Sequence, residues 1–187
     1  EIEHVRSGKS GYILAKMNSF CDYEMAKLIY EAAAEGVTID LIVRGISCVI
    51  PDVPGVSENL HVRSIVGKYL EHSRVYYFEN DGKSEIYLSS ADWMPRNLNR
   101  RVELLFPVLS TEITERIKQI LQVVMEDTVK AKIQNSEGIY EKIDRRGKKT
   151  LNSQEFFEEE AVNANKTYRV EQELEVFKPA VSKRTED

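Results

Sequence analysis

Residues 11–43 read GYILAKMNSFCDYEMAKLIYEAAAEGVTIDLIV, and this stretch decides the fold. Residues 11–17 and 37–43 are apolar runs typical of buried strands. Between them, apolar side chains recur at helical spacing after Asp22, a good N-cap, and Gly36 ends the pattern. A strand, a helix and a strand with short connections form a βαβ unit. We therefore expect two parallel strands joined by a right-handed crossover.

Three further strands are expected later in the chain. Residues 74–78 and 85–89 are rich in β-formers and flank Asn80-Asp81-Gly82, which predicts a hairpin. Residues 101–106 predict another strand, which Pro107 ends. Together with the βαβ unit, these runs predict an α/β fold with a mixed, mainly parallel sheet flanked by helices.

Helices are expected on both faces of this sheet. Residues 111–130 carry an apolar stripe at helical spacing and give the clearest helix besides residues 22–35. Residues 64–70 read as a short helix, and residues 152–161 begin with a capping-box pattern that predicts another. Residues 51–59 are rich in turn-forming residues and predict a loop.

The composition fits one folded domain. The chain has 187 residues, 42% hydrophobic and 30% charged, so it can bury a core. We expect residues 1–162 to form the domain and residues 163–187 to be a polar, mobile tail. No apolar run approaches the roughly 18 residues that a membrane span needs. The chain begins at Glu1 rather than methionine, which we interpret as a piece of a longer protein.

Charge and cysteine content narrow the class of protein. The net charge of −5 argues against a general nucleic-acid binder. Residues 1–150 hold 22 acidic and 21 basic residues, so a local basic site for an anion fits within a near-neutral body. Cys21 and Cys48 form neither a disulfide framework nor a zinc motif, which favours a reduced, cytosolic location.

His72 and Arg74 are the first candidates for chemistry. Side chains alternate along a strand, so both point to one face if the strand at 74–78 reaches back to His72. An imidazole beside a fixed cation suits phosphoryl chemistry, because the guanidinium binds phosphate oxygens while histidine moves a proton or attacks phosphorus. The alternative is an ordinary histidine at the start of a strand, beside a solvated arginine.

Arg44 is the second candidate. It ends the second parallel strand, where ligands gather in open α/β sheets, and Gly45 lets the backbone come close. A surface arginine before a turn is an equal alternative. For Arg44 to meet His72, the strand of His72 must run antiparallel to that of Arg44, or the loop before it must fold over the same edge.

Residues 89–97 form a third candidate segment, SSADWMPRN. Ser90, Asp92 and Asn97 can hold phosphate oxygens or orient a histidine. The segment can equally be a capped turn around a core tryptophan. The sequence has no glycine-rich phosphate loop, so any nucleotide phosphate would be bound by arginines and histidine.

Taken together, these segments resemble bacterial polyphosphate kinase of the large multidomain type, over about residues 8–161. The motifs that carry the resemblance are Ala15-Lys-Met-Asn18, Leu41-Ile-Val-Arg-Gly45, Val53-Pro-Gly-Val-Ser-Glu-Asn59, Leu70-Glu-His-Ser-Arg74, Tyr76-Tyr-Phe-Glu-Asn80, Ser89-Ser-Ala-Asp-Trp-Met-Pro-Arg-Asn97 and Arg100-Arg-Val-Glu103. The match is to the last domain of the family, the second of two α/β catalytic domains of the phospholipase D type.

The resemblance implies a reversible transfer of the terminal phosphate of ATP to the end of polyphosphate, with release of ADP. It proceeds through a phosphohistidine that belongs to the preceding domain, so no histidine of this chain is assigned that role and the chain alone is expected to be inactive. The resemblance implies that Arg44 contacts ATP and that His72 is a catalytic residue that binds phosphate and acts as acid or base. Arg74 stands where phospholipase D-type sites carry a lysine. Two departures are His61, where arginine is common, and Ser47, where cysteine is common.

The remaining expectations also follow from the resemblance. Ser90, Asp92 and Asn97 are phosphate-binding candidates without individual roles. Magnesium accompanies ATP, with its protein ligands upstream of this chain, and no metal ligands are expected here. The partners are ATP, ADP, polyphosphate and the upstream domains, with a homo-oligomer left open. The location is the cytoplasm, with attachment to the inner membrane left open. A phospholipase D-like phosphodiesterase, or a non-catalytic scaffold domain, remains the alternative.

Overall fold

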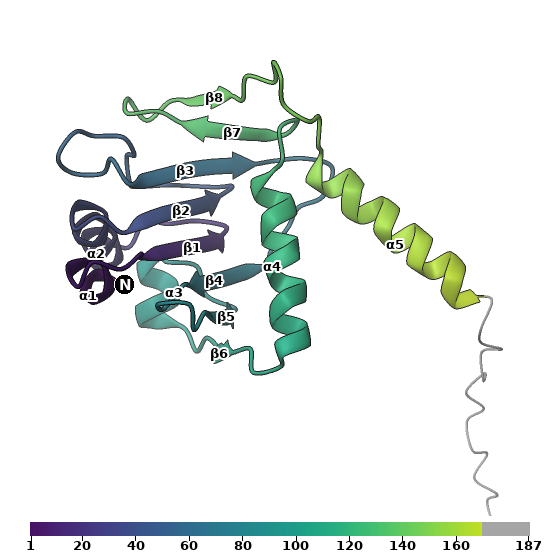
Figure 1. The fold of residues 1–187 in the computed structure, drawn as a ribbon, viewed down its shortest axis with the longest axis horizontal. Coiled ribbons are helices and arrows are strands. Elements are labelled where there is room, and N and C mark those ends of the chain that lie inside the picture. The colour runs from purple at the N-terminus through teal and green to yellow at the C-terminus, as the bar shows by residue number, and fades with distance from the viewer. Residues whose placement is uncertain (170–187) are drawn as a thin grey trace, which may run out of the picture. The chain divides into compact units, whose positions relative to one another are not determined.

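The computed structural model describes residues 1–169, and side chains through residue 165. Residues 1–154 form one compact unit, and a second unit begins at Glu155. The first unit is built on one eight-stranded sheet in the order β6-β5-β4-β1-β2-β3-β7-β8 (Figure 1). Its strands are β1 (Tyr12–Met17), β2 (Thr38–Val43), β3 (Leu60–Ile65), β4 (Arg74–Phe78), β5 (Glu85–Ser89), β6 (Leu105–Pro107), β7 (Ala131–Gln134) and β8 (Tyr140–Lys142). The helices are α1 (Ile2–Arg6), α2 (Tyr23–Ala34), α3 (Pro95–Arg100), α4 (Thr111–Met125) and α5 (Ser153–Arg169).

The expected α/β class and mixed sheet are confirmed, but the sheet is not mainly parallel. Strands β1, β2 and β3 are parallel neighbours, as the βαβ pattern predicts. Every other pairing in the sheet is antiparallel. The outer strands β4, β5, β7 and β8 include two hairpins, and a hairpin connection reverses the chain. The parallel part is therefore limited to the centre.

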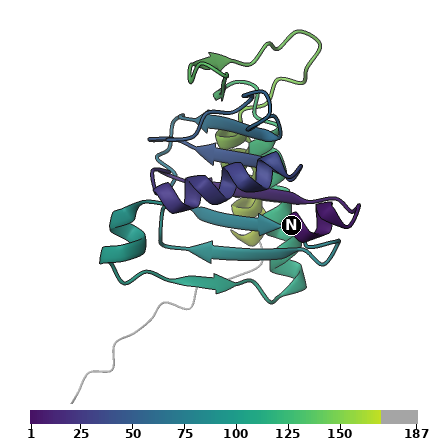
Figure 2. The ribbon, with the colours of Figure 1, turned by 90° about the vertical axis from the view of Figure 1, so that its left-hand side faces the viewer.

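The sheet is covered from both sides. Helix α2 crosses one face and α4 crosses the other (Figure 2). Apolar side chains of α2, among them Ile29 and Ala33, join Ile13, Leu41 and Val43 in the main core. On α4 the stripe Ile117, Leu121 and Val124 is buried. Asp22 caps α2 by accepting the backbone N–H of Met25, as the sequence predicts.

Two sequence predictions about helices were wrong. The segment 64–70 is not a helix, because residues 60–65 form β3 and pair with β2 and β7. The helix predicted over 111–130 ends at Met125. The buried carboxylate of Asp127 accepts the backbone N–H groups of the next turn and of Ser153, and these bonds compete with helical continuation.

The segment 95–107 also differs from the prediction. Residues 95–100 form α3, with Pro95 at the first helical position, where its missing N–H costs nothing. Of the predicted strand 101–106 only Leu105 and Phe106 pair with β5, and Pro107, which was predicted to end the strand, pairs as well. The strands β7 and β8 and the helix α1 had no clear sequence signal.

Helix α5 runs from Ser153 to Arg169, eight residues beyond the end predicted at Ala161. The part of the expected tail from residue 170 onward lies outside the described residues. Within the described part of the chain, no helix has both the length and the apolarity needed to cross a bilayer.

Candidate active site

Four segments that are distant in sequence reach one edge of the sheet. β1 and β2 are parallel, so their carboxyl ends, including Arg44, lie at this edge. β4 runs antiparallel to β1, so its first residue, Arg74, and the preceding His72 lie at the same edge. β5 is antiparallel to β4, so the segment that follows Ser89 returns there as well. The strand direction required for Arg44 to meet His72 is therefore present.

An aromatic cluster fixes these strand ends to one another. Phe20 forms isolated bridges with both Ser47 and Trp93, which ties the ends of β1 and β2 to the segment after β5. The Trp93 ring stacks on Tyr76 at 5.2 Å and meets Phe20 edge-on at 5.0 Å. Tyr76 donates its hydroxyl to the Ala91 carbonyl over 2.8 Å, and burial raises the pKa of this phenol. The polar groups around the cluster therefore have a rigid apolar base.

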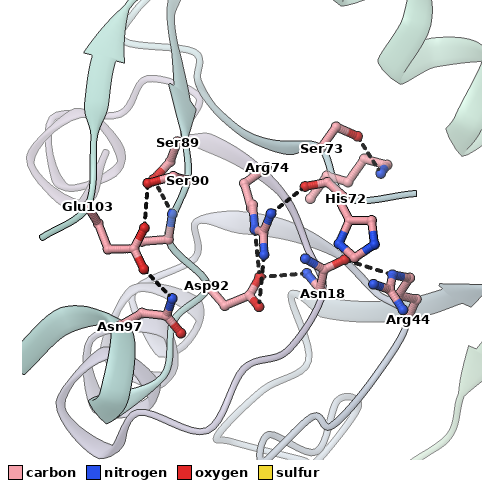
Figure 3. Close-up of polar contacts among 12 residues, drawn as sticks. Asn18, Arg44, His72, Ser73, Arg74, Ser89, Ser90, Asp92, Asn97 and Glu103 are labelled. Carbon is pink, nitrogen blue, oxygen red and sulfur yellow. Dashed lines mark hydrogen bonds and ion pairs between the residues drawn. The ribbon is translucent and has the colours of Figure 1, made fainter. Parts of the chain in front are cut away.

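Asp92 is the centre of the polar network at this edge (Figure 3). Its carboxylate accepts the backbone N–H of Asn18 at 2.8 Å and Arg74 Nε at 3.1 Å. Arg74 also donates Nη1 to the carbonyl of His72 at 2.7 Å. Asp92 and Arg74 are both largely buried, with 10% and 19% of their side-chain surfaces exposed. Their pairing therefore connects the segment after β5 to the backbone that carries His72.

Arg44 is held from one side only. Its Nε donates to Asn18 Oδ1 and to the Glu71 carbonyl, each at 2.7 Å. Within the described part of the chain, its two terminal nitrogens have no hydrogen-bond partner. Gly45 permits this arrangement, because a Cβ there would lie 2.8 Å from the Asn18 carbonyl oxygen. The guanidinium is thus oriented and retains its two terminal NH2 groups for an anion.

His72 lies in the loop before β4 and is exposed. β4 begins at Arg74, so the strand does not reach back to His72 and the alternation argument for a common face does not apply. No described residue bonds to the imidazole nitrogens, whereas the backbone carbonyl of His72 is fixed by Arg74. Arg74 directs its donors to protein groups, while the ring of His72 is available to a ligand.

Ser90 and Asn97 belong to a second network, centred on Glu103. Ser90 Oγ donates to one Glu103 oxygen, and Asn97 Nδ2 donates to the other at 2.6 Å. These bonds hold the pKa of the half-buried Glu103 carboxyl below its ordinary value. The structure therefore separates the three candidates of this segment. Asp92 is linked through Asn18 to Arg44 and through Arg74 to the backbone of His72, whereas Ser90 and Asn97 bond to Glu103.

Several residues of the site carried no individual prediction. Asn18 connects Arg44 to Asp92, and Lys16 pairs with Glu71, the residue before His72. The sequence did offer one signal for two of these residues: Lys16 lies within an apolar strand and Asn18 directly after it, where apolar residues are the norm. Of the two family departures, Ser47 bridges to Phe20 near the site, and His61 pairs with Asp40 at the other end of the strands.

The carboxylates at this edge are already engaged. Asp92 pairs with Arg74, Glu71 with Lys16, and Glu103 with two neutral donors. Among residues 1–165, no group of three or more histidine, cysteine, aspartate or glutamate side chains is arranged to hold a metal ion. The donor set does not fit a resident magnesium ion, which prefers free oxygen ligands.

Comparisons with known proteins all point to the same protein family. The model of the family described as "Polyphosphate kinase C-terminal domain 2" matches residues 1–154. A polyphosphate kinase of Bacillus anthracis is 51% identical over 154 residues, which are 82% of this chain and 22% of that protein. The chain thus spans about a fifth of the length of the curated relatives.

Solved structures agree with this result. The crystal structure of polyphosphate kinase from Porphyromonas gingivalis matches with a TM-score of 0.83 and 40% identity, over 89% of this chain and 26% of that one. Nuc from Salmonella typhimurium, a phospholipase D family member, matches with a TM-score of 0.51 and 12% identity, over 72% of this chain and 88% of that one. At that identity the likeness concerns the fold alone, which is phospholipase D-like.

Proposed function

The chain belongs to the polyphosphate kinase family, as its C-terminal domain 2, and we propose that it supplies one side of the active site of such an enzyme. The reaction transfers the terminal phosphoryl group of ATP to the end of polyphosphate and is reversible. The bond from the terminal phosphorus to the bridging oxygen breaks and ADP leaves. The phosphoryl group passes to a histidine upstream of this chain, and then to a terminal polyphosphate oxygen.

One observation carries the proposal: Arg44 and the His72 segment share an edge and both present unused polar groups there. Arg44 donates from its two terminal NH2 groups to phosphate oxygens, which gives charge-assisted, bidentate hydrogen bonds. His72 contacts the transferred phosphate and acts as acid or base. Arg74 orients the His72 segment through its bonds to Asp92 and to the His72 carbonyl, rather than by binding phosphate itself.

Other parts of the proposal concern the setting of the domain. Magnesium arrives with ATP, and its protein ligands lie upstream. ATP, ADP and polyphosphate are the ligands, the upstream domains complete the site, and the enzyme works in the cytoplasm. This chain alone lacks the nucleophile, so it does not synthesise polyphosphate.

The test compares the chain alone with an enzyme that ends in this domain. We expect no ATP-dependent polyphosphate synthesis from the chain alone. In the whole enzyme, Arg44→Ala raises KM for ATP, and His72→Ala lowers kcat by about 10²–10⁴-fold, the usual range for proton transfer. Arg6→Ala and His61→Ala serve as matched controls, because Arg6 precedes β1 and pairs with Glu35 before β2, at the opposite edge, and His61 lies near the start of β3.

Two results would overturn the proposal. One is steady polyphosphate synthesis by the chain alone. The other is a His72→Ala enzyme as active as its His61→Ala control. Cleavage of a simple phosphodiester by the isolated chain, lost in His72→Ala, would instead support the phosphodiesterase alternative.

A further inference from the structure

Lys16 is a buried cation that the proposed chemistry does not use. It lies on β1, where only 7% of the residue is exposed. Its neighbours along the strand include the core residues Leu14, Ala15 and Met17. An apolar side chain would serve the core at lower cost, because a buried ammonium loses its hydration. Its contacts therefore call for an explanation.

The ammonium of Lys16 contacts residues on both sides of His72. Nζ lies 3.0 Å from Glu71 Oε2 and donates to Ser73 Oγ at 2.8 Å. The imidazole itself is not among its contacts. One side chain of a central strand therefore fixes the residue before the histidine and the residue after it.

Gln154 extends this support to the start of the loop. Its Nε2 donates to Glu71 Oε1 at 2.8 Å and to the Tyr69 carbonyl at 2.9 Å, and its Oε1 accepts the Tyr69 N–H at 2.8 Å. Arg44 binds the Glu71 carbonyl. Glu71 and Ser73 are thus held by side chains from distant parts of the chain and the His72 carbonyl by Arg74, whereas no described residue bonds to the imidazole.

We propose that Lys16 is a positioning residue for His72, which sets the direction of the imidazole by fixing both flanking residues. The inference rests on the proposed function of His72 in phosphoryl transfer. Misplacement of a reacting group by about 1 Å can lower turnover by about 10²-fold. Arg44 keeps its bond to Asn18 without Lys16, so ATP binding should depend on Lys16 far less than turnover does.

The test uses Lys16→Met, which keeps the length of the side chain and suits the apolar surroundings. Lys9→Met is the matched control, because Lys9 forms an exposed pair with Asp81. In the whole enzyme we expect Lys16→Met to lower kcat by about tenfold or more and to change KM for ATP by less than about threefold. In this chain we expect its His72 ring NMR signals to shift or broaden, and those of His61 to stay as in the wild type.

Ser73→Ala is the second variant, because Ser73 is exposed and its substitution leaves the core intact. It removes one of the two Lys16 contacts and should cause a smaller change of the same kind. Unchanged His72 ring signals in both variants would overturn the positioning role, whatever the turnover. If the ring signals change while His72→Ala retains full turnover, the positioning role stands and the proposed function of His72 fails.

Discussion

Replacement of Asp92 by alanine should destabilise the domain far more than the same replacement of a surface aspartate would. The change removes the acceptor of the buried Asn18 N–H, and an unsatisfied buried donor costs about 1–3 kcal/mol. It also removes the partner of Arg74, which is 19% exposed and reaches water in part, so we add only about 1 kcal/mol. The expected loss is roughly 2–4 kcal/mol of unfolding free energy.

Urea denaturation of the 187-residue chain measures this loss. Trp93 is the single tryptophan, so its fluorescence reports the region around Asp92, and circular dichroism reports the whole fold. Asp144→Ala is the matched control, because Asp144 also pairs with an arginine but lies in an exposed loop. The control should keep nearly wild-type stability, because solvent screens its exposed ion pair. Equal losses in Asp92→Ala and Asp144→Ala would refute the central role of Asp92.

Three other substitutions test separate parts of the structure. Gly45→Ala places a Cβ against the Asn18 carbonyl, so it should cost roughly 1–3 kcal/mol in urea denaturation and weaken calorimetric ATP binding; wild-type values would contradict the close approach. Burial raises the pKa of Asp127, but the hydrogen bonds that its carboxylate accepts outweigh this and hold the pKa low. The ionised carboxylate therefore stabilises the fold above the ordinary carboxyl pKa, and this contribution is lost as pH falls through the lowered pKa. Asp127→Ala should approach wild-type stability only in acid. The hydrogen bond to Asp40 raises the pKa of His61, so the contribution of this pair to stability is present below about pH 6.5 and lost as pH rises through the raised pKa. In denaturation experiments His61→Gln should be less stable than the wild type by under about 1 kcal/mol near pH 5.5, and equally stable near pH 9. A loss of stability independent of pH would contradict the pairing.

Local patterns were sufficient to predict the centre of the fold. The βαβ unit, the hairpin around residues 80–82 and the start of α4 depend on neighbours in sequence, and all three are present. β3 was missed although buried and polar positions alternate at its start, which is a strand signal, because the run is short and its last residues were assigned to the helix predicted over 64–70. Its Arg63 is half-buried and donates to the Met125 carbonyl at the end of α4, a contact 62 residues away that no local pattern reveals.

The candidate site, too, was predictable only where it depends on local sequence. The strand-end rule led to Arg44, and the antiparallel direction of β4 brings the His72 loop to the same edge. The sequence could not show that Arg74 turns toward Asp92, because that pair depends on how the segment after β5 folds over the start of β4. Lys16 stood out as a charge in an apolar strand, but its partners lie more than 50 residues away.

The reversed direction of β4 has a practical consequence for labelling the protein. The strand starts at the candidate site, so the turn that follows it projects from the opposite edge of the sheet. Asn80, Asp81 and Gly82 all adopt left-handed backbone angles there, and a Cβ added at Gly82 would meet no atom within 4 Å. A short epitope or dye-binding peptide inserted after Asp81 would therefore be carried far from Arg44 and His72. Such a tag would let the domain be immobilised or followed by fluorescence while the edge that carries Arg44 and His72 stays accessible.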